Sequence, residues 1–175
     1  MWVIIDRLWL IVGNNPTIKT IMTINKNTFT GEFSYSLDSK GRLNIPAKFR
    51  NVLSKENQRS FVITRGMDTC VWVYPLEIWL TIEDELRKLS SLSRINRSFV
   101  RSTVRYASTV QYDKQGRIAL SQNLIHYAKL KKDALIIGMV NKIEIWNPKL
   151  LHTAEKDFNE IKSSEFDELA SQIVL

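Results

Sequence analysis

The sequence predicts an α+β fold in which two similar halves share one hydrophobic core. The pattern apolar-Asp-x-(Lys or Gln)-Gly-Arg-apolar occurs twice, as LDSKGRL at residues 37–43 and as YDKQGRI at residues 112–118. Each copy is followed by a short helical segment and two β-rich runs, so both halves have the order strand, strand, helix, strand, strand. A unit of about 45 residues buries too little surface to be stable alone, so we expect the halves to pack about a pseudo-twofold axis with flanking helices.

Local patterns divide the 175 residues into successive segments. This length is enough for one ordinary domain or two very small ones. The segments are an N-terminal extension of unknown role (1–28), a first repeat (29–78), a linking helical segment (79–104), a second repeat (105–151) and an acidic, helical C-terminal tail (152–175). The apolar run at residues 2–12 contains Asp6 and Arg7 and is too short to span a bilayer, so we expect no membrane partner.

In the first half, alternating apolar and polar residues at 29–37 predict a strand that leads into a tight turn and a second strand. Pro46 occupies the tolerated first position of a helix over 46–53. Two β-rich runs at 61–64 and 70–74 predict a hairpin that Pro75 ends. Helical spacing then predicts a helix over 76–89.

The second half repeats this order after an arginine-rich helix. Arg94, Arg97 and Arg101 fall on one helical face, which favours a solvated surface or an oligomer contact over base recognition. We then expect a strand (107–112), a strand (117–120), a helix (121–130), a hairpin (134–146) and a helix after Pro148. The residues expected in the core by packing are Trp72, Trp79, Trp146 and the strand residue Cys70.

The charge distribution suits a polyanionic partner. The formal net charge is +7. Residues 38–59 hold six basic and two acidic residues, residues 87–117 hold eight and one, and the tail at 154–175 holds two and six. Cys70, His126 and His152 are too few and too separated for a disulfide framework or a zinc site, so we expect a cytoplasmic protein with no metal or cofactor.

The duplicated turn has a structural and a functional explanation. In the first copy, Asp38 can accept backbone N–H groups and Gly41 permits positive φ, so Arg42 could simply form a structural ion pair with Asp38. Alternatively, the pseudo-twofold axis relates Arg42 to Arg117 as two long cationic donors suited to phosphate and guanine. In that case we expect Lys40, Lys48 and Arg50 to add charge near the first turn, with Asp113 and Gly116 shaping the second.

Catalytic explanations are weaker. Asp38 and Asp113 could resemble the paired carboxylates of an aspartic protease, but neither is followed by the tight hydroxyl-Gly step of that site. No Gly-rich phosphate loop, paired histidines or nucleophile with a base is recognisable. We therefore expect no catalytic residue and no enzyme activity.

The motifs of both halves together resemble the MraZ family of bacterial transcriptional regulators, built from two AbrB-like repeats. The resemblance rests on FTGEFSYSLDSKGRLNIPAKFRNVL, FVITRGMDTCVWVYPLEIW, DKQGRIAL and IIGMVNKIEIW. It implies swapped-hairpin or double-psi half-barrels and a ring-like homo-oligomer. It also implies sequence-specific binding of double-stranded DNA, at short direct repeats in the promoter of a cell-division and cell-wall gene cluster, in the cytoplasm and on the nucleoid. Arg42 and Arg117 are then implied in DNA contact.

Two departures from the family pattern qualify this resemblance. Where the family's second helix commonly starts with Pro and carries Arg, this chain has Ser121 and Ile125, so we expect Arg42 to matter more than Arg117. The family pattern begins near Phe29, which makes Met22 an alternative start. The alternative function is an oligomeric assembly protein whose basic turns pair with acidic protein surfaces.

Overall fold

The computed structural model describes residues 2–5, 8–11, 28–159, 168 and 170–172. It combines an antiparallel β-sheet with helices, which confirms the predicted α+β class. Most of the predicted acidic tail after residue 159 lies outside the described residues. None of the helices in the described part of the chain is long and apolar enough to cross a bilayer.

The first half has the predicted order of strands and helices. Its elements are β3 (Phe29–Ser36), β4 (Arg42–Asn44), α2 (Ala47–Asn51), the 3-10 helix η1 (Lys55–Asn57), β5 (Ser60–Arg65), β6 (Val71–Pro75) and α3 (Leu76–Arg87). Before them, β1 (Trp2–Ile5) pairs with β2 (Leu8–Ile11).

The second half repeats this order after the arginine-rich helix. Its elements are α4 (Arg94–Val104), β7 (Ser108–Gln111), β8 (Arg117–Ala119), α5 (Gln122–Tyr127), β9 (Asp133–Val140), β10 (Ile143–Trp146) and α6 (Pro148–Asn159). Ser93 caps α4 and Ser121 caps α5, each through a side-chain oxygen that accepts a backbone N–H three residues on.

Strands of the two halves pair with each other. The main sheet has the order β3-β9-β10-β6-β5-β7, and β4 pairs with β8 in a separate two-stranded ribbon. β3 corresponds to β7, β5 to β9 and β6 to β10 in the two halves. Exchanging the two members of each pair reverses the strand order of the sheet, so the sheet has the symmetry of the repeat. Neither half can therefore complete its sheet without the other.

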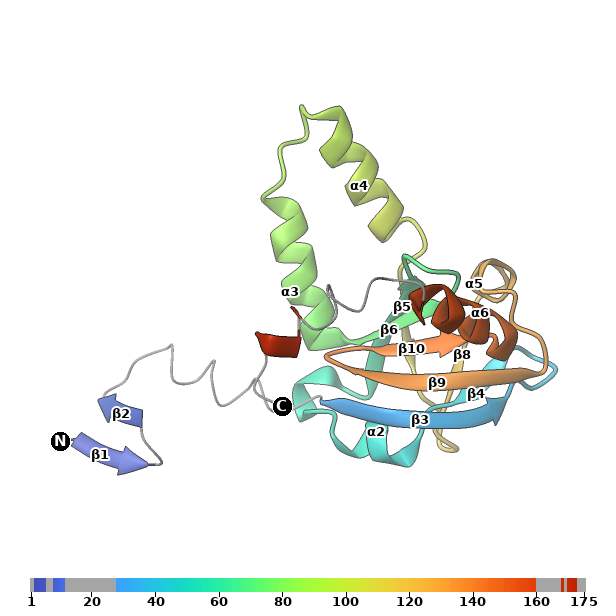
Figure 1. The fold of residues 1–175 in the computed structure, drawn as a ribbon, viewed down its shortest axis with the longest axis horizontal. Helices are drawn as coiled ribbons and strands as arrows, with labels where there is room; N and C mark the ends of the chain where they lie inside the picture. Colours follow the sequence, from blue (N-terminus) through green and yellow to red (C-terminus); the bar gives the residue numbers. More distant parts are fainter. Residues whose placement is uncertain (1, 6–7, 12–27, 160–167, 169, 173–175) are drawn as a thin grey trace.

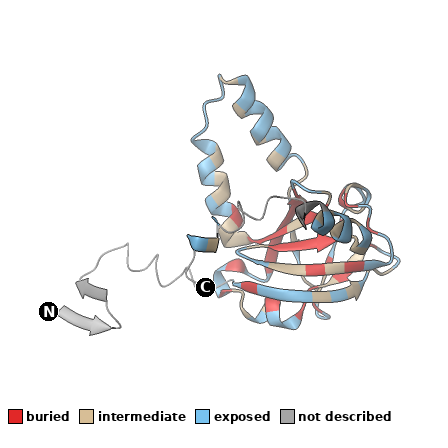
Figure 2. Cartoon of the chain, in the orientation of Figure 1, coloured by how far each residue is buried: buried red, intermediate tan, exposed pale blue. Residues whose placement is uncertain are grey.

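One core joins both halves (Figure 2). Leu43 and Ile118, which follow the two motif arginines, are fully buried and face each other in the β4–β8 register. Phe49 of α2 packs edge-on against Phe29 and Phe33 of β3. This shared core is the arrangement expected for halves that are too small to fold alone.

α3 and α4 form an arm that extends away from the sheet (Figure 1). α3 contacts β5 and β6, and α4 contacts β5. The arm carries exposed apolar side chains, among them Leu92 (91% exposed), which lies between the two helices, and Ile95 of α4 (80% exposed).

The structure corrects some details of the sequence analysis. Trp79 and Trp146 are buried as expected, but Trp72 is only half-buried because it lies at the edge of a smaller cluster formed by Val62, Tyr74 and Trp79. The helix predicted over 121–130 ends at Tyr127, since Lys129 adopts a φ of 47° in the left-handed region.

Candidate nucleic-acid interface

The first turn is built around the Asp38 carboxylate. Oδ1 of Asp38 accepts the backbone N–H groups of Lys40 and Arg42, both at 2.9 Å. Oδ2 accepts the Arg42 Nε–H at 2.7 Å. One aspartate therefore shapes the turn and also orients the arginine that follows it.

The second turn repeats these bonds around Asp113. Oδ1 accepts the backbone N–H groups of Gln115 at 2.9 Å and Arg117 at 3.0 Å. Oδ2 accepts Nε and Nη2 of Arg117 at 2.9 and 2.7 Å. The structural ion pair considered for each motif is thus present in both turns.

Both motif positions require glycine for two reasons: the backbone has a positive φ, and a residue of the opposite half lies too close for a side chain. Gly41 has φ +71° and Gly116 has φ +81°, which L side chains rarely adopt. A Cβ on Gly41 would lie 2.9 Å from Ile125 Cδ1 of α5, and a Cβ on Gly116 would lie 2.5 Å from Arg50 Cζ of α2. Each turn therefore packs beneath the short helix of the other half.

The β4–β8 ribbon brings the two arginines to one surface. Arg42 pairs with Ala119 and Asn44 pairs with Arg117, while Leu43 and Ile118 point into the core. Since side chains alternate along a strand, both arginines and Asn44 lie on the outer face. Arg117 Nη1 lies 3.6 Å from Oδ2 of Asp38, so the guanidinium groups of both turns reach one carboxylate.

Both motif carboxylates are held in the ionised form. The Arg42 backbone N–H is the largest influence that lowers the pKa of Asp38 below its ordinary value of 3.8. The Arg117 side chain lowers the pKa of Asp113 to about 2. An aspartic-protease pair works by sharing one proton between its carboxylates, whereas these carboxylates each serve an arginine.

Arg50 lies at the second turn, not at the first as expected. Its Nε donates to the Ile45 carbonyl at 3.0 Å, and its guanidinium lies over Gly116 and 5.8 Å from the centre of the Tyr112 ring. Arg50 therefore adds its charge beside Gly116 of the second turn, whereas the expectation placed it near the first turn. The crossed pairing of the halves, which the sequence order does not reveal, causes the difference.

Lys40 and Lys48, both expected near the first turn, lie in different parts of the fold. Lys40 is exposed within the turn. Lys48 Nζ instead donates to the Thr30 carbonyl at 3.0 Å, at the start of β3, whereas the first turn follows the end of that strand. Lys48 therefore does not belong to the group around Arg42, contrary to expectation.

Sequence reasoning missed three residues of this surface. Arg59 lies 4.9 Å from the centre of the Tyr112 ring and donates to the Tyr112 carbonyl. Lys114 is exposed inside the second motif, where the first motif has Ser39. Asn44 lies opposite Arg117 in the ribbon, with its side-chain oxygen buried and without a hydrogen-bond partner among the described residues. Only Lys114 carried a signal, its place inside the repeated motif.

The chain matches a known family over most of its length. The family model described as MraZ protein, antitoxin-like, matches residues 28–102 and again 104–173. The transcriptional regulator MraZ of Halothermothrix orenii is 43% identical over 143 residues, which cover 79% of this chain and 97% of the relative. The proteins of the same name from Pediococcus pentosaceus and Natranaerobius thermophilus are each 42% identical, over 79% and 83% of this chain and 97% and 96% of theirs. The chain therefore belongs to the MraZ family.

Proposed function

We propose that this protein is a sequence-specific DNA-binding transcriptional regulator that contacts DNA through the two arginine-bearing turns. The observation that carries the proposal is the convergence of Arg42 and Arg117 on the outer face of the β4–β8 ribbon, joined through Asp38. The relatives named transcriptional regulators support the same function. We propose no catalytic role.

The chemistry of the turns fits this function. Each guanidinium is oriented by an aspartate, which reduces the conformational freedom that an arginine would lose on binding. The Arg42 side chain bonds only through Nε, and among the described residues its two terminal amino groups have no protein partner. Those groups can bind a phosphate or the O6 and N7 acceptors of guanine.

Around these turns, other cations supply sequence-independent attraction. Lys40 and Lys114 are exposed within the motifs, and Arg50 and Arg59 flank Tyr112 beside the second turn. Phosphate contacts of this kind set the register of a protein on DNA but carry no base preference. We assign base recognition to Arg42 first and Arg117 second.

Arg42 and Arg117 differ in how many of their N–H donors are already used within the protein. Arg117 uses Nε and Nη2 on Asp113, and its Nη1 approaches Asp38, whereas Arg42 uses Nε alone. Arg42 consequently has more donors available for DNA. Arg50 adds positive charge beside the second turn, which raises the attraction of the Arg117 side for DNA.

We further propose that the crossed strand pairing is an AbrB-like arrangement and that several subunits assemble into a ring. Exposed apolar residues of the α3–α4 arm, such as Leu92 and Ile95, support subunit contacts. An oligomer would present the turns to successive direct repeats of a promoter, so that affinity rises through multivalency. The proposed target is the promoter of the cell-division and cell-wall gene cluster, reached in the cytoplasm on the nucleoid.

The test is fluorescence anisotropy of the purified protein with DNA from upstream of its own gene and with a shuffled sequence of equal length, across a salt series. We expect tighter binding to the native DNA at every salt concentration. Equal, steeply salt-dependent affinity for both sequences would reduce the interaction to phosphate attraction and overturn sequence specificity. Loss of the oligomer on Arg42→Ala, with no sequence preference in the parent, would favour the assembly function.

A further inference from the structure

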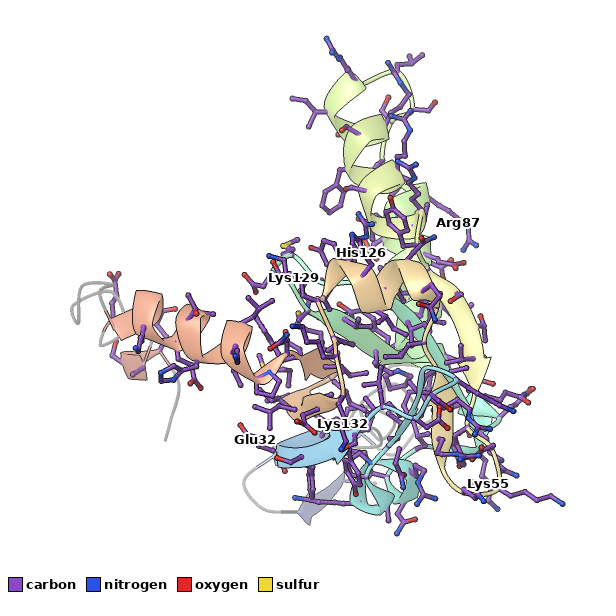
Figure 3. The ribbon with its side chains drawn as sticks, turned by 90° about the vertical axis from the view of Figure 1, so that its right-hand side faces the viewer. Glu32, Lys55, Arg87, His126, Lys129 and Lys132 are labelled. Carbon is purple, nitrogen blue, oxygen red and sulfur yellow. The ribbon has the colours of Figure 1, made fainter. Side chains whose placement is uncertain are left out.

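A cavity at the base of the arm is separate from the turns. It has a volume of about 520 Å³ and lies between α4, the start of α3, the strands β5 and β6 with their connecting loop, and α5. Tyr127 of α5 is one of the lining residues, and its neighbour in sequence, His126, is labelled in Figure 3. This volume falls in the range of small-molecule sites, roughly 300–1,000 Å³.

The lining combines aromatic rings with cations. The aromatic residues are Trp72, Tyr74, Trp79, Phe99, Tyr106 and Tyr127. The cations are Arg65 of β5, Arg101 of α4 and Arg105 directly after it, and no Asp or Glu lines the cavity. Within the part of the chain that the structure describes, none of these three arginines forms an ion pair, so their charges are available to an anionic ligand.

Arg65 is the best-defined of the three cations. Its Cζ lies 3.5 Å from the centre of the Tyr106 ring and 4.4 Å from that of Tyr127, so the guanidinium is in cation–π contact with both tyrosines. Its Nε is buried and has no hydrogen-bond partner among the described residues. Arg65 as a whole is half-buried and lines the cavity, so the part of its guanidinium that faces the cavity can donate to a bound anion.

Neighbouring carboxylates are already engaged by other donors. Glu144 accepts the indole N–H groups of Trp72 at 2.9 Å and Trp146 at 2.8 Å. Glu83 accepts the Trp79 indole N–H at 2.6 Å and an Arg87 N–H at 3.0 Å. These bonds fix the cavity's two tryptophans, and neither carboxylate itself lines the cavity.

We propose that this cavity binds a small aromatic anion, a planar ring that bears a phosphate or carboxylate group, of which a nucleoside monophosphate is the representative. The ring would lie among the aromatic side chains, and the anion would accept hydrogen bonds from Arg65, Arg101 and Arg105. A metal cation is disfavoured by the arginines, and a neutral apolar ligand would leave these cations without an acceptor in the cavity. Because α4 and the sheet both supply contacts, the bound ligand would fix the arm against the sheet.

The experiment is isothermal titration calorimetry of the full chain without DNA, so that its result is independent of the proposed regulator function. The probes are adenosine and guanosine 5′-monophosphates, adenosine, which lacks the anion, and ribose 5-phosphate, which lacks the aromatic ring. We expect saturable binding of a monophosphate, with adenosine and ribose 5-phosphate each weaker by about tenfold or more. No saturable heat with either monophosphate would overturn the proposal, as would equal affinity for adenosine or ribose 5-phosphate.

Matched variants locate the site. Arg101→Gln and Arg105→Gln remove exposed cations that line the cavity, so we expect each to weaken binding of the monophosphate about tenfold. Arg94→Gln removes the same charge from an exposed position of α4 that does not line the cavity, and it should leave the affinity unchanged. An equal loss from Arg94→Gln would show diffuse attraction and overturn the site. Dissociation of the oligomer by Arg101→Gln, with no monophosphate binding in the parent, would mean that the cavity is a subunit contact.

Discussion

Arg50, on the short helix of the first half, lies directly over Gly116 in the turn of the second half. The equivalent contact in the other direction joins Ile125 to Gly41. Each motif is therefore held in place by the opposite repeat, and the shape of the arginine surface depends on the association of both halves.

The first prediction concerns Gly116. Gly116→Ala forces a side chain into φ +81° and against the Arg50 guanidinium, so we expect a loss of about 1–3 kcal/mol in the free energy of unfolding, measured in urea. Adding Arg50→Ala to this variant should restore the steric part of the loss but not the backbone part. Full stability of Gly116→Ala would contradict the proposed role of the turn.

Interdependence of the halves gives the second prediction. Expressed alone, residues 28–104 should not give a cooperative thermal unfolding transition, because β3, β4 and β5 each lose a partner strand from the other half. Mixing this fragment with residues 105–175 should restore the transition. Independent folding of the first fragment, seen by dispersed amide resonances in NMR, is the result that rules this out.

Acid stability gives the third prediction. The pKa of Asp113 is about 2 in the folded protein and 3.8 ordinarily, so its ion pair with Arg117 stabilises the fold fully above the ordinary value. That contribution disappears as the pH falls through the folded value. We expect Asp113→Asn to flatten the loss of unfolding free energy between pH 4 and pH 2 in acid titrations followed by circular dichroism, and an unchanged profile would argue against this ion pair.

Glu144 carries the fourth prediction. It is buried, and its two oxygens accept indole N–H groups from Trp72 and Trp146. Glu144→Leu leaves two donors without an acceptor, so we expect a loss of about 2–4 kcal/mol of unfolding free energy, at roughly 1–2 for each donor. Replacing the exposed Glu85 by Leu is the matched control and should change the unfolding free energy by less than about 0.5 kcal/mol. A loss no larger than that of the control would show that the indole bonds do not stabilise the fold.

The sequence predicts local structure well here and spatial neighbours poorly. Alternation at residues 29–37, the turn residues Asp38 and Gly41, and the hairpins before Pro75 and Pro148 are local signals, and the structure confirms the elements that they predict. The neighbours of Arg50 depend instead on which half supplies each partner strand, and nothing in one segment encodes that choice. The same reason hides Arg59 beside Tyr112, since their approach follows from the pairing of β5 with β7.

Direct contact of Arg42 and Arg117 with DNA is tested most directly by variants that each remove one positive charge. Affinity for the native upstream DNA should be measured at several salt concentrations for the parent, Arg42→Ala, Arg117→Ala and Lys156→Ala, with the oligomeric state checked for each. Lys156 is an exposed cation near the end of α6, so its removal controls for net charge. We predict that Arg42→Ala weakens binding about tenfold or more and removes the preference over shuffled DNA, that Arg117→Ala has a smaller effect, and that Lys156→Ala matches the parent. Parent-like affinity and preference in both arginine variants would contradict the claim.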